Sequence, residues 1–167
     1  FDQSYGRRLA ACAQRDGVQV RIHVKVDTGM TRIGFPYRDN VEDAAAVDEI
    51  EEICGLPGLY PEGIFTHFSC ADERGNAEVY TRLQYDLFLN MVERLRRRGI
   101  SFELRHCCNS AATLHYPEMH LDLVRPGIIL YGMMPAPEMS DPLGLRPAME
   151  LKTVISQIKE VPAGVPV

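Results

Sequence analysis

The chain opens with a helical pattern and then switches to strict alternation. Residues 3 to 15 read as the end of a helix, and the Asp16-Gly17 pair that follows them is a typical helix stop. From residue 18 to 26 apolar and polar side chains alternate, which predicts a strand. The polar side of this strand carries Gln19, Arg21, His23 and Lys25. Such a polar face suits the interior of a barrel near its mouth.

Two further helices are predicted from their spacing. Residues 39 to 54 are acidic and alanine-rich with a helical period, and Gly55 is placed to close that helix. The clearest helix runs from residue 76 to 99, and arginines crowd its last turn, where the helix dipole favours cations. Its expected buried stripe consists of Val79, Leu83, Leu87, Met91 and Leu95, which recur four apart.

Short apolar runs between these helices predict further strands. Residues 63 to 68 and 100 to 107 have strand length and composition. A short helical turn follows at residues 109 to 116, with Asn109 as its N-cap. Residues 121 to 132 are predicted to be extended, although a proline interrupts them. Alternation returns at residues 148 to 161 with no helix before it, which favours the start of a separate β module.

The order of these elements predicts an α/β fold. Repeated strand-helix units imply a parallel sheet with right-handed crossovers. About four such units correspond to half of a (β/α)8 barrel of the TIM type. We therefore expect residues 1–147 to form the C-terminal half of a barrel and residues 148–167 to begin a β domain. No G-x-G-x-x-G segment follows a strand, which disfavours a dinucleotide-binding fold.

Composition narrows the class of protein. Hydrophobic residues make up 46% of the 167 residues and the formal net charge is -5, so a globular domain that binds neither nucleic acid nor a membrane surface is expected. Five cysteines, an odd number, favour reduced thiols in a cytoplasmic protein over a disulfide framework. Because the first residue is Phe and the chain stops without a polar tail, we expect a fragment of a longer protein.

Polar side chains gather where the predicted strands end, which is where parallel sheets bind ligands. Ser110 begins a short helix whose free N–H groups suit a phosphate, and Gly127-Ile128 offers further backbone donors. Arg125 is a permanent cation, and His67 is suited to stacking on a flat ring or exchanging a proton. Together these groups predict a pocket for a planar, phosphorylated, anionic cofactor. The complete set of candidates is Lys25, Asp27, Arg32, His67, Asn109, Ser110, Arg125, Gly127 and Ile128.

Each candidate also has an ordinary structural interpretation. His67 could be a satisfied structural histidine, Ser110 a simple cap, and Arg125 an ion-pair partner. The Asp27-Thr28-Gly29 segment could be only a turn, and it also matches an aspartic-protease motif, although a second such segment and an all-β pattern are missing. His106-Cys107-Cys108 lacks the C-x2-C spacing of a metal site, so no metal is expected.

Four segments together resemble one family in order and spacing. They are "HVKVDTGMTRIGF", "GIFTHFSCADE", "CNSAATL" and "LVRPGIILYG", and the resemblance covers nearly all of residues 18 to 167. The family is that of the alanine racemases, which are pyridoxal 5'-phosphate (PLP) enzymes with a barrel domain followed by a β domain. The resemblance implies interconversion of L- and D-alanine for peptidoglycan precursors by a cytoplasmic homodimer that takes a small amino acid as substrate.

The resemblance also implies a role for each matching residue. Lys25 matches a lysine that is often carbamylated and that orients Arg32, the arginine that contacts the cofactor's phenolic oxygen and the substrate carboxylate. A negatively charged carbamate would hold that guanidinium by a charge-assisted pair. His67 matches a histidine lying against the cofactor ring, and Arg125 matches the arginine facing the pyridine nitrogen.

The remaining matches concern the phosphate. Ser110 corresponds to a direct phosphate ligand next to Asn109, and Gly127 and Ile128 correspond to backbone donors. An arginine facing the pyridine nitrogen does not readily give up a proton, so the ring stays unprotonated and proton exchange at one carbon is favoured over side reactions. In this family two bases on opposite faces of the substrate carry that exchange.

Two parts of the family's pattern are missing from the sequence. The Schiff-base lysine segment and the serine-tyrosine-glycine segment with the opposing tyrosine are both absent, and Tyr131 is not that tyrosine. We therefore expect the chain alone to be inactive. Three alternatives stay open: a serine or broad-specificity racemase, a non-catalytic PLP-binding barrel protein, and a structural module built from half a barrel, which would expose sheet edges and an apolar surface.

Overall fold

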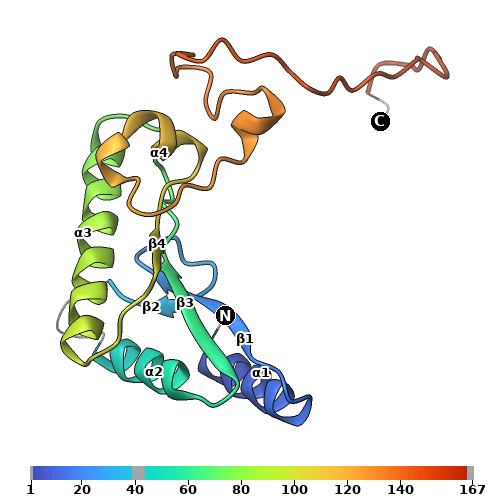
Figure 1. Ribbon diagram of the computed structural model, residues 1–167. Coiled ribbons are helices and arrows are strands. Elements are labelled where there is room, and N and C mark those ends of the chain that lie inside the picture. Colours follow the sequence, from blue (N-terminus) through green and yellow to red (C-terminus); the bar gives the residue numbers. More distant parts are fainter. Residues whose placement is uncertain (1, 39–43, 165–167) are drawn as a thin grey trace.

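The computed structural model describes residues 2–38 and 44–164, which form one parallel sheet with helices against it (Figure 1). The sheet has the order β2-β1-β3-β4, and every pairing in it is parallel. Three strand-helix units in succession build this sheet, as expected for part of a barrel. The strands are β1 (Val20–Asp27), β2 (Phe35–Pro36), β3 (Leu59–Phe65) and β4 (Leu104–His106). The helices are α1 (Gln3–Arg15), α2 (Ala44–Gly55), α3 (Asn76–Arg97) and α4 (Ser110–His115), with 3₁₀ turns η1 (Pro117–Met119) and η2 (Ile128–Tyr131).

The expected helices are confirmed, and the three strands predicted at residues 18–26, 63–68 and 100–107 are present as β1, β3 and β4. Strand β3 lies earlier in the chain than predicted, at Leu59–Phe65, and β4 is shorter, at Leu104–His106. Helix α1 covers the expected residues 3 to 15, and its first turn is capped by the Asp2 carboxylate, which accepts a hydrogen bond from the Tyr5 N–H at 2.7 Å. The described part of the acidic helix begins at Ala44, so the prediction for residues 39–43 lies outside the described residues.

The helices lie in the order of the chain around the sheet. Helix α2 contacts both α1 and α3 and also packs on strands β2 and β3. Figure 1 shows α3 standing along one side of the sheet, with α2 and α1 near the amino-terminal end of β1. The core between them includes Val26, Ile50, Ile64, Phe88 and Met91, each with no measurable exposure. Burial of these side chains is the main force that holds the helices on the sheet.

The buried stripe of α3 differs from the one that its sequence predicts. Leu87, Met91 and Leu95 are buried as expected, but Val79 is 70% exposed and Leu83 is 49% exposed. A four-residue step overshoots one helical turn by about 40°, so five such positions spiral around the helix instead of sharing a face. The amino-terminal half of the helix therefore buries two polar side chains, Thr81 and Gln84, and Phe88 joins the buried apolar positions of the other half.

The prediction that residues 121 to 132 form a strand is wrong. They run beside β4, where the Asp122 N–H donates to the Arg105 carbonyl at 3.1 Å and the Arg125 N–H donates to the Cys108 carbonyl at 3.0 Å. No regular ladder forms, because Pro126 has no N–H and the chain then turns into η2. Strand β2, by contrast, is too short to give a period and was not predicted.

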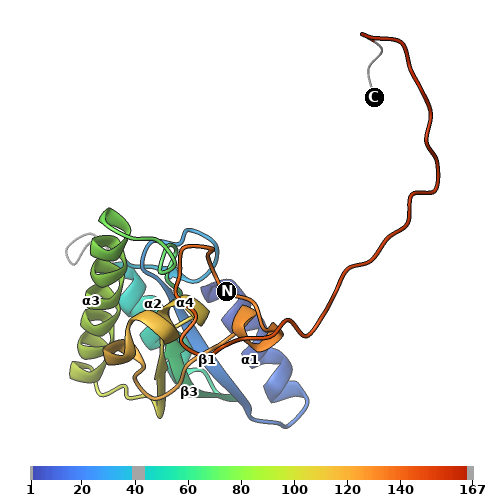
Figure 2. The same ribbon diagram turned by 90° about the horizontal axis from the view of Figure 1, so that it is seen from above.

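The predicted strand at residues 148 to 161 is also absent. Residues 148–164 are exposed and carry no ladder, and Figures 1 and 2 show this segment leading away from the body of the molecule. The Ala148 N–H donates to the Tyr131 carbonyl at 2.9 Å, which ties the segment to the body only at its beginning. An alternating pattern forms a strand only when another strand accepts its hydrogen bonds, and no described segment lies beside it.

A polar hollow at the carboxyl ends of the strands

A hollow of about 290 Å³ opens where the sheet ends, beside α4 and η2. Its wall includes six of the residues predicted from sequence, which come from three separate parts of the chain. The residues are His67, Asn109, Ser110, Arg125, Gly127 and Ile128, and the wall is completed by Asp72, Ala111 and Pro135. The expectation that polar groups converge at this edge is therefore met for these six residues.

The amino-terminal turn of α4 forms one side of the hollow. The Asn109 side chain accepts a hydrogen bond from the Ala112 N–H at 3.0 Å, which confirms Asn109 as the N-cap. Ser110 is buried, and its Oγ accepts a hydrogen bond from the Gly127 N–H at 2.7 Å. This bond joins the start of α4 to the start of η2, so both sets of backbone donors face one space.

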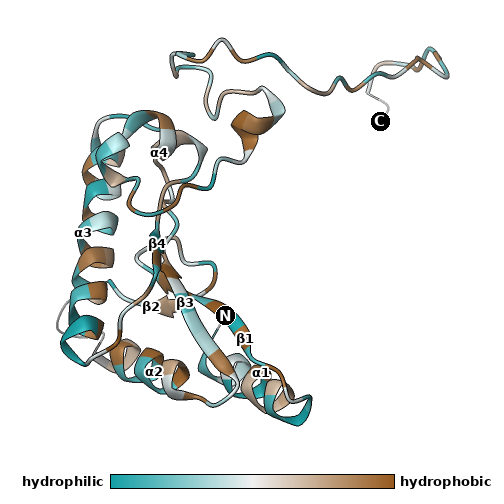
Figure 3. Ribbon diagram, viewed as in Figure 1, coloured by the Kyte–Doolittle hydropathy of each residue, from teal (hydrophilic) through white to brown (hydrophobic). Residues whose placement is uncertain are grey.

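Gly127 keeps that space clear. A side-chain carbon built at Gly127 would lie 3.8 Å from the Ser110 Oγ, so any larger residue would extend into the hollow. The turn η2 that follows carries exposed apolar side chains, seen as the brown segment near the top of Figure 3. Ile128 is 40% exposed and Leu130 is 71% exposed.

Arg125 is held by neutral acceptors. Its Nη1 donates to His106 Nδ1 at 2.6 Å, and its Nη2 donates to the Thr66 carbonyl at 2.9 Å. The same Nη2 lies 3.2 Å from His67 Nδ1 and 3.2 Å from the Cys107 carbonyl. No carboxylate among the described residues pairs with this guanidinium. The ion-pair interpretation of Arg125 is therefore wrong, and its positive charge remains available to a ligand.

Both histidines beside Arg125 are neutral near pH 7. Burial and then the Arg125 charge lower the pKa of His67 to about 4, with Arg32 and Lys25 adding to the effect. Burial and Arg125 likewise lower the pKa of His106 to about 4. Because each Nδ1 accepts from Arg125, each imidazole carries its proton on Nε2.

Lys25, near the end of β1, and Arg32, which follows that strand, both lie outside the wall of the hollow. Lys25 is buried, and its Nζ donates to the Ile33 carbonyl at 2.8 Å. Burial lowers the pKa of Lys25; Asp27 opposes that shift, and Arg32 and Arg125 reinforce it. Arg32 is exposed and does not line the hollow, although its charge reaches both Lys25 and His67. We expected His67, Ser110, Arg125 and Arg32 to share one hollow. The first three do, and Arg32 does not.

The Asp27-Thr28-Gly29 segment is a structural turn. The Asp27 carboxylate accepts hydrogen bonds from the Gly29 and Thr31 N–H groups, and these hold its pKa below the usual range although burial alone would raise it. Thr28 hydrogen-bonds to Thr66 at 2.7 Å, which links β1 to the end of β3. No described carboxylate pairs with Asp27; Arg38 lies 3.4 Å from it and the Lys25 charge also acts on it, which contradicts the aspartic-protease interpretation.

The adjacent cysteines are packing residues. Cys107 and Cys108 are fully buried, and both thiols donate to the Met119 carbonyl at 3.2 Å. The Cys108 thiol and burial raise the pKa of Cys107, which makes it unreactive. Among the described residues no group of three His, Cys, Asp or Glu side chains is arranged to hold a metal ion.

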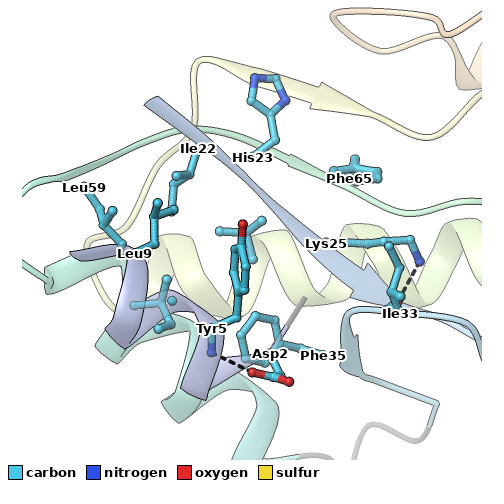
Figure 4. A pocket seen from close by; sticks show the side chains of 13 residues that line it. Asp2, Tyr5, Leu9, Ile22, His23, Lys25, Ile33, Phe35, Leu59 and Phe65 are labelled. Atoms are coloured by element: carbon cyan, nitrogen blue, oxygen red, sulfur yellow. Dashed lines mark hydrogen bonds between the residues drawn. The ribbon is translucent and has the colours of Figure 1, made fainter. Parts of the chain in front are cut away.

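A second pocket, of about 330 Å³, is mainly apolar and lies between α1 and the sheet (Figure 4). Leu9, Ile22 and Leu59 meet there, and Tyr5 reaches in from α1. Figure 4 also shows Lys25 turned toward Ile33 at the far side of this pocket. Its lining is mostly apolar, with Asp2, His23 and Lys25 among its few polar side chains, so it offers fewer groups to orient a ligand than the polar hollow does.

The parallel sheet, with its polar hollow beyond the strand ends, defines a barrel-type α/β domain. The chain belongs to the family described as "Alanine racemase, N-terminal domain", which matches residues 1–135. No helix in the described parts of the chain is both long and apolar enough to cross a membrane.

Relatives of known name agree with this assignment. An alanine racemase of Desulforamulus reducens is 48% identical over 165 residues, which cover 98% of this chain and 43% of that protein. One of Desulfovibrio desulfuricans is 44% identical, over 99% of this chain and 42% of its own length. The solved alanine racemase of Clostridium difficile 630 in complex with cycloserine superposes with a TM-score of 0.81 and 37% identity, over 89% of this chain and 39% of its own. This chain spans about two fifths of these proteins.

Some residues around the hollow were missed by the sequence analysis. His106 was considered only as a metal ligand, yet its Nδ1 accepts the shortest hydrogen bond that Arg125 makes. Thr66 contributes a backbone carbonyl, which no side-chain motif reveals. Asp72 and Pro135 line the wall without a sequence signal. The position of His106 could have indicated its role. It lies near the end of a predicted strand, as His67 does, so both histidines lie at the carboxyl edge of the parallel sheet.

Proposed function

We propose that this chain forms the cofactor-binding part of a PLP-dependent racemase that interconverts L- and D-alanine. The observation that carries the proposal is the guanidinium of Arg125, which is held by neutral groups and pairs with no described carboxylate, in the same hollow as the Ser110–Gly127 junction. A phosphorylated pyridine needs an anion site at one end and a donor at its ring nitrogen, and this wall offers both. The family membership and the names of the relatives support alanine as the substrate.

The phosphate end of the site consists of the first turn of α4 and the Gly127–Ile128 backbone. Ser110 supplies a hydroxyl, and the starts of α4 and η2 supply backbone N–H groups that suit an oxyanion. The Gly127 N–H donates to the Ser110 Oγ in this structure and would exchange that partner for the phosphate. The space beside Gly127 is kept open by the missing side chain. These residues fit a phosphate ester, and Asn109 acts here through its cap on α4.

The ring end consists of His67 and Arg125. Neutral His67 is suited to lie against a flat aromatic ring without adding charge. Arg125 donates a hydrogen bond and, although burial lowers its pKa, an arginine stays protonated in proteins. PLP, when bound, supplies a ring that withdraws electrons from the α-carbon of the substrate. A donor that keeps its proton leaves the ring nitrogen unprotonated, which favours removal and return of one proton at that carbon.

Lys25 and Arg32 serve the substrate side in this proposal. A lysine whose pKa is lowered by burial is more often in the neutral form that adds to carbon dioxide, with loss of one proton, to give a carbamate. The new negative charge would be stabilised by Arg32 and Arg125, which now disfavour the ammonium form. The carbamate would then orient Arg32 toward a substrate carboxylate.

The proposal assigns neither catalytic base to residues 1–167. The lysines are Lys25, Lys152 and Lys159, and none of them lines the polar hollow. We therefore infer that these residues are inactive without the rest of a longer protein. In that protein residues 1–147 would belong to the barrel, and residues 148–167 would begin a β domain. We further propose a cytoplasmic homodimer that supplies D-alanine for peptidoglycan precursors.

Chiral chromatography on the protein encoded by the complete reading frame around these residues tests the activity. With PLP present, L-alanine should be converted to a mixture of both enantiomers, whereas residues 1–167 alone should leave it unchanged. If L-serine were converted faster than L-alanine, serine would be assigned as the substrate in place of alanine. Pyridoxal phosphate binding without any racemisation would contradict the catalytic proposal and favour a binding protein.

Binding of pyridoxamine 5'-phosphate to residues 1–167, followed by its fluorescence, tests the hollow separately. Gly127→Val fills the phosphate end and should weaken binding at least tenfold, about 1.4 kcal/mol. Gly55→Ala is the matched control, because nothing lies within 4 Å of the added carbon. Equal affinity for both variants would contradict the placement of the phosphate.

A further inference from the structure

A line of hydrogen-bonded side chains connects Arg125 to Glu62 on strand β3. Arg125 Nη1 lies 2.6 Å from His106 Nδ1, and His106 Nε2 lies 2.7 Å from His23 Nδ1. On its other side, His23 Nε2 lies 3.4 Å from the Glu62 carboxylate. Arg125 lines the hollow and His106 ends β4 behind it, outside the wall. His23 is on β1, and Glu62 is on β3 with an exposed Arg21 as its partner at 2.5 Å.

The two ends of this line fix the proton on every nitrogen within it. A guanidinium only donates, so His106 Nδ1 must accept and His106 Nε2 must carry the proton. His106 Nε2 therefore donates to His23 Nδ1, which places the proton of His23 on its Nε2. That proton faces Glu62, which as a carboxylate only accepts. Every hydrogen bond in the line therefore runs in the same direction, from the cation to the anion. At each contact one donor faces one acceptor.

Gly63 makes the contact between the two histidines possible. In the sheet His23 pairs with Gly63 on β3, which lies between β1 and β4. Two side chains on next-nearest strands are normally separated by the side chain of the middle strand. A carbon added at Gly63 would lie 2.6 Å from His23 Nδ1 and 2.7 Å from its Cε1, so the ring would have to move. The missing side chain lets His23 reach across to His106.

Packing around His106 holds the inner end of the line. The Phe65 ring stacks on His106 with centroids 4.9 Å apart and an angle of 7° between the planes. The Arg125 guanidinium carbon lies 5.1 Å from the centroid of the same Phe65 ring. Phe65 thus fixes the plane of the imidazole and supports the guanidinium, so the bond between them has one geometry.

We propose that His106, His23 and Glu62 form a directional hydrogen-bond line that positions Arg125, and that Gly63 is glycine in order to let that line cross strand β3. His23, His106 and Glu62 are positioning residues, since they act on a ligand only through Arg125. The line holds Nη1 of the guanidinium and the Thr66 carbonyl holds Nη2, so the guanidinium keeps one orientation in the wall of the hollow. The importance of that direction for catalysis rests on the proposed function.

Nuclear magnetic resonance of residues 1–167 labelled with ¹⁵N tests the line without any cofactor. We expect both histidines in the Nε2–H form and a scalar coupling across the His106–His23 hydrogen bond. We also expect separate, slowly exchanging Nη signals for Arg125. Absence of that coupling in the unchanged chain, or an Nδ1–H form of either ring, would overturn the proposal.

Gly63→Ala breaks the line while all of its side chains remain present. It should abolish the His106–His23 coupling and speed the exchange of the Arg125 Nη signals at least tenfold. Gly55→Ala is the matched control and should change neither signal. A lost coupling with unchanged Arg125 exchange would overturn the positioning role, and a retained coupling would overturn the role of Gly63.

A second variant covers the case in which Gly63→Ala does not fold. His23→Phe keeps a ring of similar size and removes the acceptor, so the Arg125 Nη exchange should again become faster. Glu62→Gln, made in the otherwise unchanged chain, still offers an acceptor oxygen to His23 and should largely retain the slow exchange. Unchanged exchange in His23→Phe would overturn the proposal. These readouts need no racemase activity, so their failure is distinguishable from failure of the proposed function.

Discussion

The two hollows of this molecule have nearly the same size but differ in what forms them. The pocket between α1 and the sheet measures about 330 Å³ and is lined mainly by apolar side chains such as Leu9 and Ile22. The hollow beside α4 measures about 290 Å³ and is lined by hydrogen-bonding groups. In the apolar pocket side chains pack against one another, whereas in the polar hollow Arg125 and Ser110 are held by bonds to backbone and histidine groups.

This difference shows that volume is a poor guide to function in an α/β domain. An apolar pocket stabilises the fold through burial, and its residues are exchangeable for others of similar shape. A polar hollow costs stability, because buried polar groups must be paired, and it is retained where a ligand uses them. Variants at the two sites should therefore separate stability from binding.

The largest expected effect is on stability, at the apolar pocket. Ile53 is 3% exposed and lies against Gly6, with no room for another group between them. Ile53→Ala should lower the free energy of unfolding by about 3 kcal/mol, measured by urea denaturation. The affinity for pyridoxamine 5'-phosphate of the folded fraction should stay the same. A loss of affinity with little loss of stability would reverse the assignment of the two hollows.

The polar hollow should make stability depend on pH. The unfolded chain takes up protons at histidine near pH 6.5, whereas folded His106 takes one up only near pH 4. The unfolded state thus binds more protons between these values, so stability falls as the pH decreases from about 6.5 to 4. For His106, which is 4% exposed, the loss should amount to roughly 2–3 kcal/mol.

Urea denaturation at a series of pH values measures this loss, with His106→Gln as the control that should reduce the slope. His67 should contribute in the same direction, since its pKa is also lowered to about 4. Stability that stays constant across this range would show that the histidines beside Arg125 are not held neutral.

A smaller effect is expected at the cap of α4. Asn109→Ala removes the acceptor for the Ala112 N–H and should cost about 1 kcal/mol of stability, while Asn109→Asp should keep most of it. Because the cap fixes the turn that presents Ser110, Asn109→Ala should also weaken binding of pyridoxamine 5'-phosphate. A stability loss with unchanged affinity would limit Asn109 to a structural role.

The smallest effect is expected far from both hollows. Arg97 pairs with Glu93 at 2.9 Å, but its side chain is 73% exposed and Arg96 already pairs with the same carboxylate. Arg97→Ala should change the free energy of unfolding by less than about 0.5 kcal/mol and leave binding unchanged. A loss above about 1 kcal/mol would show that exposed ion pairs contribute more to the stability of this protein than we assume, and the smaller effects predicted for the other variants could then not be assigned to the two hollows.

Local pattern was a good guide where a segment makes most of its own bonds. Helix α1, its end and the cap of α4 follow from the spacing of a few residues. The same reasoning failed along α3, where equal spacing placed Val79 and Leu83 on the outside, and in residues 148–164, whose alternation has no neighbouring strand to pair with. On α3 the error lay in the angle between four-residue steps, whereas in residues 148–164 the outcome depends on a partner strand that a local pattern does not contain.

The sequence by itself determined the helices, three of the strands, the edge of the sheet at which polar groups gather, and the residue types found there. Only the tertiary structure decided that Arg125 is bound by His106 and the Thr66 carbonyl, that Arg32 stays outside the wall, and that the gap at Gly63 joins two histidines. The physical reason is that side-chain type and period are properties of the chain. Hydrogen bonds between residues 19 to 83 positions apart exist only once the strands are in register.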